Sequence, residues 1–476
     1  MRDKFQASHI SVYHKKSAFL YLPRGTVKPD LLFRLSAPLV VMGQSCKLCL
    51  LFLPAAMLGG CYLVVRREVV GRLFYLSIRM GLQWAGPTFA KLGQWAATRP
   101  DLLPLKLCNE LGKLQSGAPA HDHAWNERVI QQIFGCPLED AFVEFERAPA
   151  GSGTVGQVHQ ARMRQNPNIV VAVKIIHPGV HDRVERELLF VRTVAVLLDM
   201  IPGIKWMQFR EQSALFAQMM RDQLDLRQEA WTLDRFSRNF RDGRVEFARP
   251  ILATADLLVQ TWEDGVSLEA YLKNVRCEED SQNLTKSGLS AFLQMVLWDN
   301  FVHADLHPGN IKISSTVPPH LIILDTGLTI ELSGMDHDNL ADLFRAMFLD
   351  QNHRRVGELM LERRPQPQAV DREGFIGKVA ELCEQISPIR RKGESMKLSG
   401  VPLGETFLKA FEVARVHRVQ LEPAFTRVVM ALVVIEGVGR QLYPDLDLMP
   451  IMRQAAMQYI ISETARRLTQ TIQPHL

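Results

Sequence analysis

The apolar positions of this chain form one long uninterrupted run near the start, then shorter runs with a helical or strand period. The long run, residues 48–65, carries no charge and approaches the about 20 residues that a bilayer-spanning helix needs. Arg66, Arg67 and Arg72 follow it directly, a basic flank typical of the non-translocated side of a membrane. We predict a single membrane-spanning helix within residues 36–66, with a buried helix as the alternative.

Beyond this run the period of the apolar positions changes between helix and strand. Phe89, Leu92 and Ala96 fall on one stripe of a helix that starts at Pro87 and ends at Arg99-Pro100. Strands are predicted at Phe142–Glu146, Gln157–Arg162, Ile169–Ile176 and Leu257–Thr261. Further helices are predicted from near Val180 and over Leu289–Phe301, Asp338–Leu349 and Ala424–Gln441. The pattern therefore predicts both helices and strands along the chain.

Composition narrows the class of protein only modestly. The chain has 476 residues and 47% apolar residues, which is enough for two or three domains with a large core. A net charge of +5 is a mild excess that fits a nucleotide pocket or an anionic lipid surface and does not indicate nucleic acid. Residues 1–35 are basic and acid-poor, as in a mitochondrial transit peptide, although a disordered leader is the alternative.

Two short turns beside apolar runs carry the most specific chemistry. Asn310 follows Asp305 by five residues, and Asp325 ends the apolar run Leu321–Leu324 before Thr326-Gly327. This is the spacing of a kinase catalytic loop and its metal-binding turn. Carboxylate and amide oxygens suit Mg²⁺, and Asp305 is then the base or the group that orients the attacking atom. The alternative is a metal hydrolase with ligands His303, Asp305 and His307.

Upstream, a strand and a small-residue loop provide the partners that such a site needs. Lys174 lies in an apolar strand, where it should meet an acid or phosphates, and Glu185 and Glu187 are nearby candidate acids. The loop before the preceding strand is small enough for its backbone N–H groups to approach phosphates. Its residues are Ala150, Gly151, Ser152, Gly153, Thr154, Val155 and Gly156.

Several motifs together resemble one family. They are Lys91-x-Gly93-Gln94 with Thr98-Arg99-Pro100-Asp101-Leu102-Leu103-Pro104, Gly156-Gln157-Val158-His159, Val171-Ala172-Val173-Lys174, His303-Ala304-Asp305-x-His307-Pro308-Gly309-Asn310 and Asp325-x-Gly327. Over roughly residues 82–445 the chain resembles the aarF-domain-containing (UbiB-type) kinase-like family. The resemblance implies a two-lobed protein-kinase-like α+β fold with an N-terminal helical extension.

The resemblance also implies a domain order and a role for each site residue. Lys174 would bind the α/β-phosphates of ATP with Glu229 as its partner, the adenine would meet the backbone near Gln260 and Trp262, and Lys91 and Gln94 would gate the site. Asn310 and Asp325 would hold Mg²⁺. The domains would be a leader at 1–35, the membrane helix at 36–66, the extension at 67–135, the small lobe at 136–265, the large lobe at 266–460 and a tail at 461–476.

This chain departs from the family pattern at two places and from ordinary protein kinases at two others. The family's alanine-rich loop is replaced by Ala150-Gly151-Ser152-Gly153, and the glutamate expected to grip Lys91 is Gln223. Ala304 stands where protein kinases carry an arginine, and no Ala-Pro-Glu follows Asp325. These departures leave the Lys91 contact open and give no peptide-docking platform.

The function implied is that of a membrane-anchored atypical kinase or ATPase of the phosphotransferase class. It would use ATP and Mg²⁺ in a mitochondrial membrane, in lipid or coenzyme Q metabolism. Its other partners would be a lipid or quinone-like molecule, the membrane and coenzyme Q pathway proteins, with no nucleic acid. A protein serine/threonine kinase and a nucleotide-binding pseudokinase scaffold are the alternatives.

Overall fold

The computed structural model describes residues 20–21, 31–114, 117–274, 277–362, 371–386, 397–398, 403–448 and most of 450–461. The predicted leader, residues 1–35, and the tail, residues 461–476, lie almost wholly outside these described residues. The chain folds into two compact units, each described here by itself. Unit 1 comprises residues 1–97, 106–238 and 248–263, and unit 2 comprises residues 98–105, 239–247 and 264–476.

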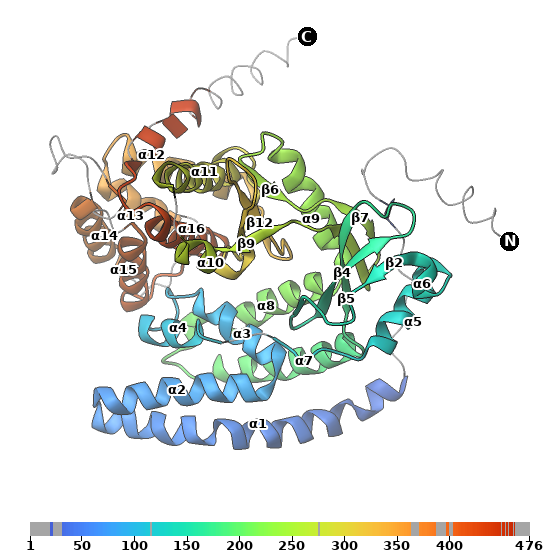
Figure 1. The fold of residues 1–476 in the computed structure, drawn as a ribbon. Helices are drawn as coiled ribbons and strands as arrows, with labels where there is room; N and C mark the ends of the chain where they lie inside the picture. Colours follow the sequence, from blue (N-terminus) through green and yellow to red (C-terminus); the bar gives the residue numbers. More distant parts are fainter. Residues whose placement is uncertain are drawn as a thin grey trace, which may run out of the picture. The chain divides into compact units, whose positions relative to one another are not determined.

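A mostly antiparallel sheet is the centre of unit 1 (Figure 1). Its strand order is β1-β7-β8-β5-β4-β2, and β3 pairs with β4. The strands are β1 (Leu20–Tyr21), β2 (Phe142–Phe145), β3 (Gly151–Ser152), β4 (Gly156–Met163), β5 (Val170–Ile176), β7 (Pro250–Ala253) and β8 (Leu257–Thr261). Val171, Val173 and Ile175 alternate along β5 and are almost fully buried, so every second residue of this strand enters the core.

Helices surround this sheet, and several begin or end at the expected capping residues. Asp122 caps α5 through its side chain, Gly135 ends α5 in the left-handed conformation, and Gly179 precedes α7 in the same conformation. The helices of this part are α1 (Leu31–Val65), α2 (Glu68–Ala85), α3 (Pro87–Ala97), α4 (Leu105–Leu111), α5 (His123–Phe134), α6 (Leu138–Ala141), α7 (Val180–Leu198), α8 (Phe209–Gln223) and α9 (Leu226–Asn239).

The predicted membrane-spanning helix within residues 36–66 is wrong. Nowhere in the described residues is there a helix both long and apolar enough to span a bilayer. The apolar run belongs to α1, which packs along α2 (Figure 1), and within this run Leu48 and Ala55 are buried. Phe52 lies over Gly81, Phe74 over Gly59 and Tyr62 over Gly71. Helix α1 also packs on α7, where Leu51 and Phe52 join a cluster that includes Phe190.

Unit 2 is mostly helical, with two small sheets at its start. One sheet has the order β6-β12-β11-β9 and the other pairs β10 with β13. The strands are β6 (Val245–Phe247), β9 (Gly265–Ser267), β10 (Val302–His303), β11 (Ile311–Ser314), β12 (Leu321–Ile323) and β13 (Thr329–Ile330). The helices are α10 (Leu268–Lys273), α11 (Glu278–Leu297), α12 (Gly334–Phe348), α13 (His353–Glu362), α14 (Arg372–Ile386), α15 (Leu403–Val416) and α16 (Pro423–Leu442).

The short segment 98–105 contributes a buried ion pair to unit 2. Arg99 and Asp101 are 2% and 0% exposed, and Arg99 donates two hydrogen bonds of 2.9 and 2.7 Å to the Asp101 carboxylate. An ion pair removed from water this completely is held only by such bidentate geometry. The Thr-Arg-Pro-Asp segment therefore has a structural role in unit 2.

Candidate functional site

Lys174 and Glu229 form the centre of the candidate site in unit 1. Lys174 lies in β5, and its Nζ is 2.8 and 2.7 Å from the two carboxylate oxygens of Glu229 in α9. Their side chains are 17% and 8% exposed, so the pair is largely removed from water. The other candidate acids are engaged elsewhere, because Glu185 pairs with Arg221 at 2.7 Å and Glu187 is buried beside Thr88.

The small-residue loop is a tight hairpin that leads into β4. Gly151 pairs with Val158 and Ser152 with Gln157, and the Gly153 N–H donates to the Gly156 carbonyl at 2.9 Å. Gly151 and Gly153 are exposed at the tip, whereas Thr154, Val155 and Gly156 are buried. Only Gly156 is required by sterics, because a Cβ there would lie 2.4 Å from the Ile175 carbonyl oxygen. The exposed tip is the part that can meet a phosphate.

The strand expected to meet adenine is well ordered in the sheet. Gln260 pairs with Ala172 of β5, and the Trp262 N–H donates to the Val170 carbonyl at 3.1 Å. That amide is therefore used within the sheet, and a base edge approaching this strand would need other backbone groups. Unit 1 ends directly after it, at Glu263.

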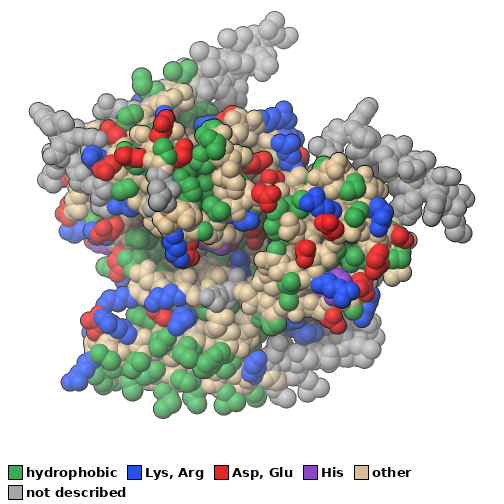
Figure 2. Space-filling view, in the orientation of Figure 1, with side chains coloured by type: hydrophobic (Ala, Val, Ile, Leu, Met, Phe, Trp, Pro, Cys, Tyr) green, Lys and Arg blue, Asp and Glu red, His purple; other side chains and the backbone are tan. Residues whose placement is uncertain are grey.

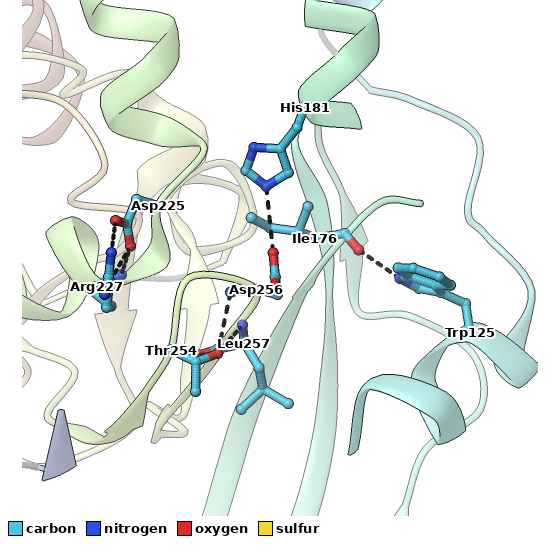
Figure 3. Close-up of polar contacts among 8 residues, drawn as sticks. All are labelled: Trp125, Ile176, His181, Asp225, Arg227, Thr254, Asp256 and Leu257. Carbon is cyan, nitrogen blue, oxygen red and sulfur yellow. Dashed lines mark hydrogen bonds and ion pairs between the residues drawn. The ribbon is translucent and has the colours of Figure 1, made fainter. Parts of the chain in front are cut away.

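The gating residues of the extension also have protein contacts. The Gln94 side chain donates to the Leu114 carbonyl at 2.9 Å, and Lys91 is half-buried in α3. Asp225, which precedes Glu229, binds the Arg227 side chain at 2.6 and 2.8 Å (Figure 3). Gln223 ends α8 at the position where the family pattern has a glutamate. Gln94 is thus committed to holding the extension together within unit 1.

In unit 2 the catalytic-loop residues lie on two adjacent turns. Asp305 follows β10, and the Asn310 Nδ2 donates to the Asp305 carbonyl at 3.0 Å. Asp325 follows β12 with φ +49°, a left-handed conformation that Asp tolerates better than most residues. The Leu324 N–H donates to the Asn310 carbonyl at 2.8 Å and so ties the second turn to the first.

His303 joins these two turns and is fully buried. Its Nδ1 accepts from the Asp305 N–H at 3.2 Å, and its ring lies near the backbone of Leu324 and Asp325. Burial lowers the pKa of His303 below its usual value, while the charges of Asp305 and Asp325 oppose that shift. Burial thus favours the neutral form of His303, and its hydrogen bond to the Asp305 N–H helps to position that turn, a role that the sequence pattern did not indicate.

The oxygen donors of unit 2 fit magnesium better than zinc. The Asn310 nitrogen is used in a hydrogen bond, which leaves its amide oxygen to act as a ligand, and the Asp325 side chain is exposed. Amide and carboxylate oxygens are the ligands that Mg²⁺ prefers. The hydrolase alternative gains no support, because no metal-holding group of three or more His, Cys, Asp or Glu side chains occurs in the described part of the chain.

Unit 1 carries a lysine on the central strand of an antiparallel sheet. Unit 2 carries an Asp-x-x-x-x-Asn loop that is tied to an Asp-x-Gly turn. These features together define the class of kinase-like proteins. Within this class, residues 113–360 match the ABC1 atypical kinase-like domain, and residues 386–447 match the UbiB helical domain. The chain belongs to the ABC1/UbiB atypical kinase-like family, so the resemblance seen in the sequence is confirmed.

Curated relatives agree with this assignment. The chain is 32% identical to the ABC1 family protein YPL109C, mitochondrial, of Saccharomyces cerevisiae, over 81% of this chain and 69% of that protein. It is 31% identical to the ABC1 family protein C21C3.03, mitochondrial, of Schizosaccharomyces pombe, over 80% and 66%. It is 28% identical to the probable serine/threonine-protein kinase abkC of Dictyostelium discoideum, over 87% and 68%.

The solved structure is that of the Rv3197–erythromycin complex from Mycobacterium tuberculosis. It superposes with a TM-score of 0.51 at 19% identity, and the match covers 76% of this chain and 89% of that one. At this identity the likeness shows the fold alone.

Proposed function

We propose that this protein binds Mg-ATP and either hydrolyses it or transfers its γ-phosphoryl group, in mitochondrial lipid or coenzyme Q metabolism. The observation that carries the proposal is the Lys174–Glu229 pair, with Nζ–O distances of 2.8 and 2.7 Å. In kinases such a pair presents the lysine ammonium to the α/β-phosphates. A largely buried lysine that served only the fold would be more costly than an apolar residue at the same position.

The remaining site residues supply binding and proton handling. Gly151 and Gly153 present exposed backbone at the loop tip for the phosphates. Asp305 would accept the proton of the attacking hydroxyl or water, and Asn310 and Asp325 would hold the metal. Bound magnesium would neutralise charge that develops on the phosphates.

The choice of a lipid or quinone-like acceptor rests on the family and on the absence of peptide-docking features. Ala304 replaces the arginine that docks a phosphorylated activation loop, and no Ala-Pro-Glu follows Asp325 in the sequence. Two relatives are named as mitochondrial proteins, which supports a mitochondrial site of action. The printed name of the Dictyostelium relative keeps a protein serine/threonine kinase as the second candidate.

The α1–α2 face, which we define as Leu50, Leu53, Met57, Val64, Val69 and Leu73, favours contact with a lipid surface. These side chains are 46–85% exposed, and Figure 2 shows apolar side chains gathered over α1 and α2. Arg66, Arg67 and Arg72 lie beside them, and Glu68 is the acid among them. An exposed apolar face with a basic border suits the interface of an anionic bilayer, with the helices lying on its surface.

The test is nucleotide turnover by the purified full chain, with and without anionic vesicles and quinone precursors. We expect Lys174→Ala and Asp305→Asn to reduce turnover by about 10²-fold or more, whereas Asp350→Asn, at a surface pair with Arg345, leaves it unchanged. Phosphate transfer to generic protein substrates, unaffected by lipid, would favour the protein-kinase alternative. Binding of Mg-ATP without any turnover under these conditions would establish the scaffold alternative.

A further inference from the structure

Three histidines of unit 1 lie directly beneath the small-residue loop, and the proposed reaction does not use them. His121 precedes α5, His159 is in β4, and His177 follows β5. His177 Nε2 is 3.0 Å from the Gly153 carbonyl oxygen, and its Nδ1 is 2.7 Å from the Nδ1 of His121. The loop that would hold phosphates is therefore hydrogen-bonded, through the Gly153 carbonyl, to a pair of imidazoles.

The orientation of this network is fixed at one end by backbone groups. The Gln157 Oε1 accepts from the His121 N–H at 3.0 Å, so its amide nitrogen faces His159 Nε2 at 2.9 Å. His159 Nε2 must then accept, and its Nδ1 donates to the Glu146 carbonyl at 2.7 Å. His159 is thus a neutral imidazole with both nitrogens satisfied.

Asn126 transmits this orientation to His121. Its Nδ2 lies 3.1 Å from the accepting His159 Nε2, so its Oδ1, at 2.7 Å from His121 Nε2, must accept. His121 Nε2 therefore carries a hydrogen. The Trp125 Nε1 donates to the Ile176 carbonyl at 2.9 Å and holds the end of β5, next to His177, against α5 (Figure 3).

The His121–His177 pair, when neutral, has one hydrogen too few for its three contacts. A hydrogen is needed for the Asn126 Oδ1, one for the Gly153 carbonyl, and one between the two Nδ1 atoms. Two neutral imidazoles carry only two hydrogens, whereas one imidazole and one imidazolium carry three. All three contacts are satisfied only when the pair holds one additional proton.

We propose that His121 and His177 are positioning residues that share one titratable proton, and that this proton completes their three contacts, makes the hydrogen bond to the Gly153 carbonyl charge-assisted, and so sets the loop for phosphate binding. This inference rests on the proposed nucleotide-binding function of the loop. A second contact, from the Ser152 Oγ to the Ala118 carbonyl at 2.8 Å, does not titrate and holds the loop in both states. Protonation therefore tightens a loop that is already folded.

Burial lowers the pKa of both histidines of the pair below the usual value. Burial lowers the pKa of His121, with His159 in the same direction and Asn126 and Asp122 opposing it. Burial likewise lowers the pKa of His177, with His121 and Arg183 in the same direction and the Gly153 carbonyl opposing it. The pair is thus neutral at alkaline pH, where one of its three contacts lacks a hydrogen, and all three contacts form together as the pH falls.

The experiment compares Mg-ATP affinity of the full chain between pH 5.5 and 8 in three variants. His177→Gln keeps a donor near the Nε2 position that does not titrate, and His177→Phe removes the donor. His353→Gln is the matched control, because burial also lowers the pKa of His353 but this residue lies in α13 of unit 2. The titration of the nucleotide itself is common to all variants and cancels in the comparison.

As the pH falls from 8 to 5.5, the Mg-ATP affinity of the wild type and of His353→Gln should rise about tenfold relative to that of His177→Phe. This is the size expected for one charge-assisted hydrogen bond. His177→Gln should keep a constant advantage over His177→Phe at every pH. A wild-type advantage over His177→Phe that does not change with pH would overturn the proposal.

Hydrogen exchange of residues 150–158 without nucleotide separates this inference from the proposed function. After correction for intrinsic rates, wild-type exchange at the loop should slow on acidification, and exchange in His177→Phe should not. If this holds while no variant binds Mg-ATP, the network stands and the proposed function fails. If nucleotide binds but loop exchange is independent of pH in the wild type, the shared proton is refuted.

Discussion

Lys174 binds both carboxylate oxygens of Glu229, although 55 residues separate them and Glu185 and Glu187 lie much closer in the chain. The partner is therefore supplied by α9, whereas α7, the helix that directly follows the lysine strand, uses Glu185 for a surface pair with Arg221. Substitutions of Glu229 and Glu185 can therefore be compared directly to test which glutamate serves Lys174.

Glu229→Gln should reduce nucleotide turnover by about 10²-fold, because the lysine loses the charge that fixes its ammonium. Glu185→Gln should leave turnover unchanged and cost about 0–1 kcal/mol of stability, as expected for an exposed pair. Steady-state kinetics and thermal unfolding of both variants are the measurements. Equal activity losses in the two variants would show that α7 supplies the functional acid.

The glycines of the loop should differ sharply in their tolerance of a methyl group. At Gly156 a Cβ would meet the Ile175 carbonyl oxygen at 2.4 Å, whereas at Gly151 nothing lies within 4 Å. Gly156→Ala should therefore lower the free energy of unfolding by about 1–3 kcal/mol, and Gly151→Ala should be neutral or slightly stabilising. Denaturant unfolding tests this, and an equal loss in both variants would contradict it.

Glu187 of α7 should make the protein less stable at alkaline pH. Burial raises the pKa of Glu187 above its usual value, while Thr88, Arg183, Arg186 and Lys47 oppose that shift. A raised folded-state pKa gives stability that is present below the unfolded-state pKa and lost as the pH rises through the folded-state pKa. Glu187→Gln should therefore raise the Tm at pH 8 and leave it unchanged at pH 4.

Glu185 of the same helix provides a control of opposite sign. The Arg221 hydrogen bond lowers the pKa of Glu185, so its contribution to stability is present at high pH and lost as the pH falls through the folded-state value. Glu185→Gln should slightly lower the Tm at pH 8, with no difference at acid pH. The prediction for Glu187 fails if Glu187→Gln lowers the Tm at pH 8.

The α1–α2 face should bind anionic vesicles. Replacing Leu50 and Leu53 together by Asp should reduce co-sedimentation of the full chain with vesicles that contain an anionic phospholipid, because two apolar contacts are lost and two repelling charges are added. Met335→Asp in unit 2 is the control, since Met335 is 71% exposed, as Leu50 is at 72%. Equal binding to neutral and anionic vesicles would argue against a role for the arginines.

The sequence predicted the local elements of the chain well, because their signals are local. The β-branched run at Val170–Ile176 and the glycine before Val180 define a strand and a helix at nearly the predicted bounds, and the helix predicted at Ala424–Gln441 is α16. The kinase-like α+β class followed from the resemblance to the family. The choice of Glu229 over Glu185 needed the family resemblance, because spacing along the chain favours the nearer residue.

What the sequence could not predict depends on contacts between distant segments. The apolar run at 48–65 has the composition of a membrane helix, but composition does not show that Gly71 and Gly81 of another helix receive its aromatic rings. The histidine network was missed for the same reason, since its members come from three separate segments. His159 stood within a quoted motif, where strand alternation already placed it on one face with Gln157 and Ala161.

The three ring-on-glycine contacts between α1 and α2 have a consequence for how this hairpin responds to its surroundings. Sliding one helix past the other by a turn would bring each ring against a side chain instead of a glycine. The two helices can therefore pack in one register only. The outer surface of the α1–α2 hairpin therefore presents its side chains at fixed distances from one another. If the hairpin binds a bilayer, the bilayer and not the hairpin would have to change its curvature or thickness.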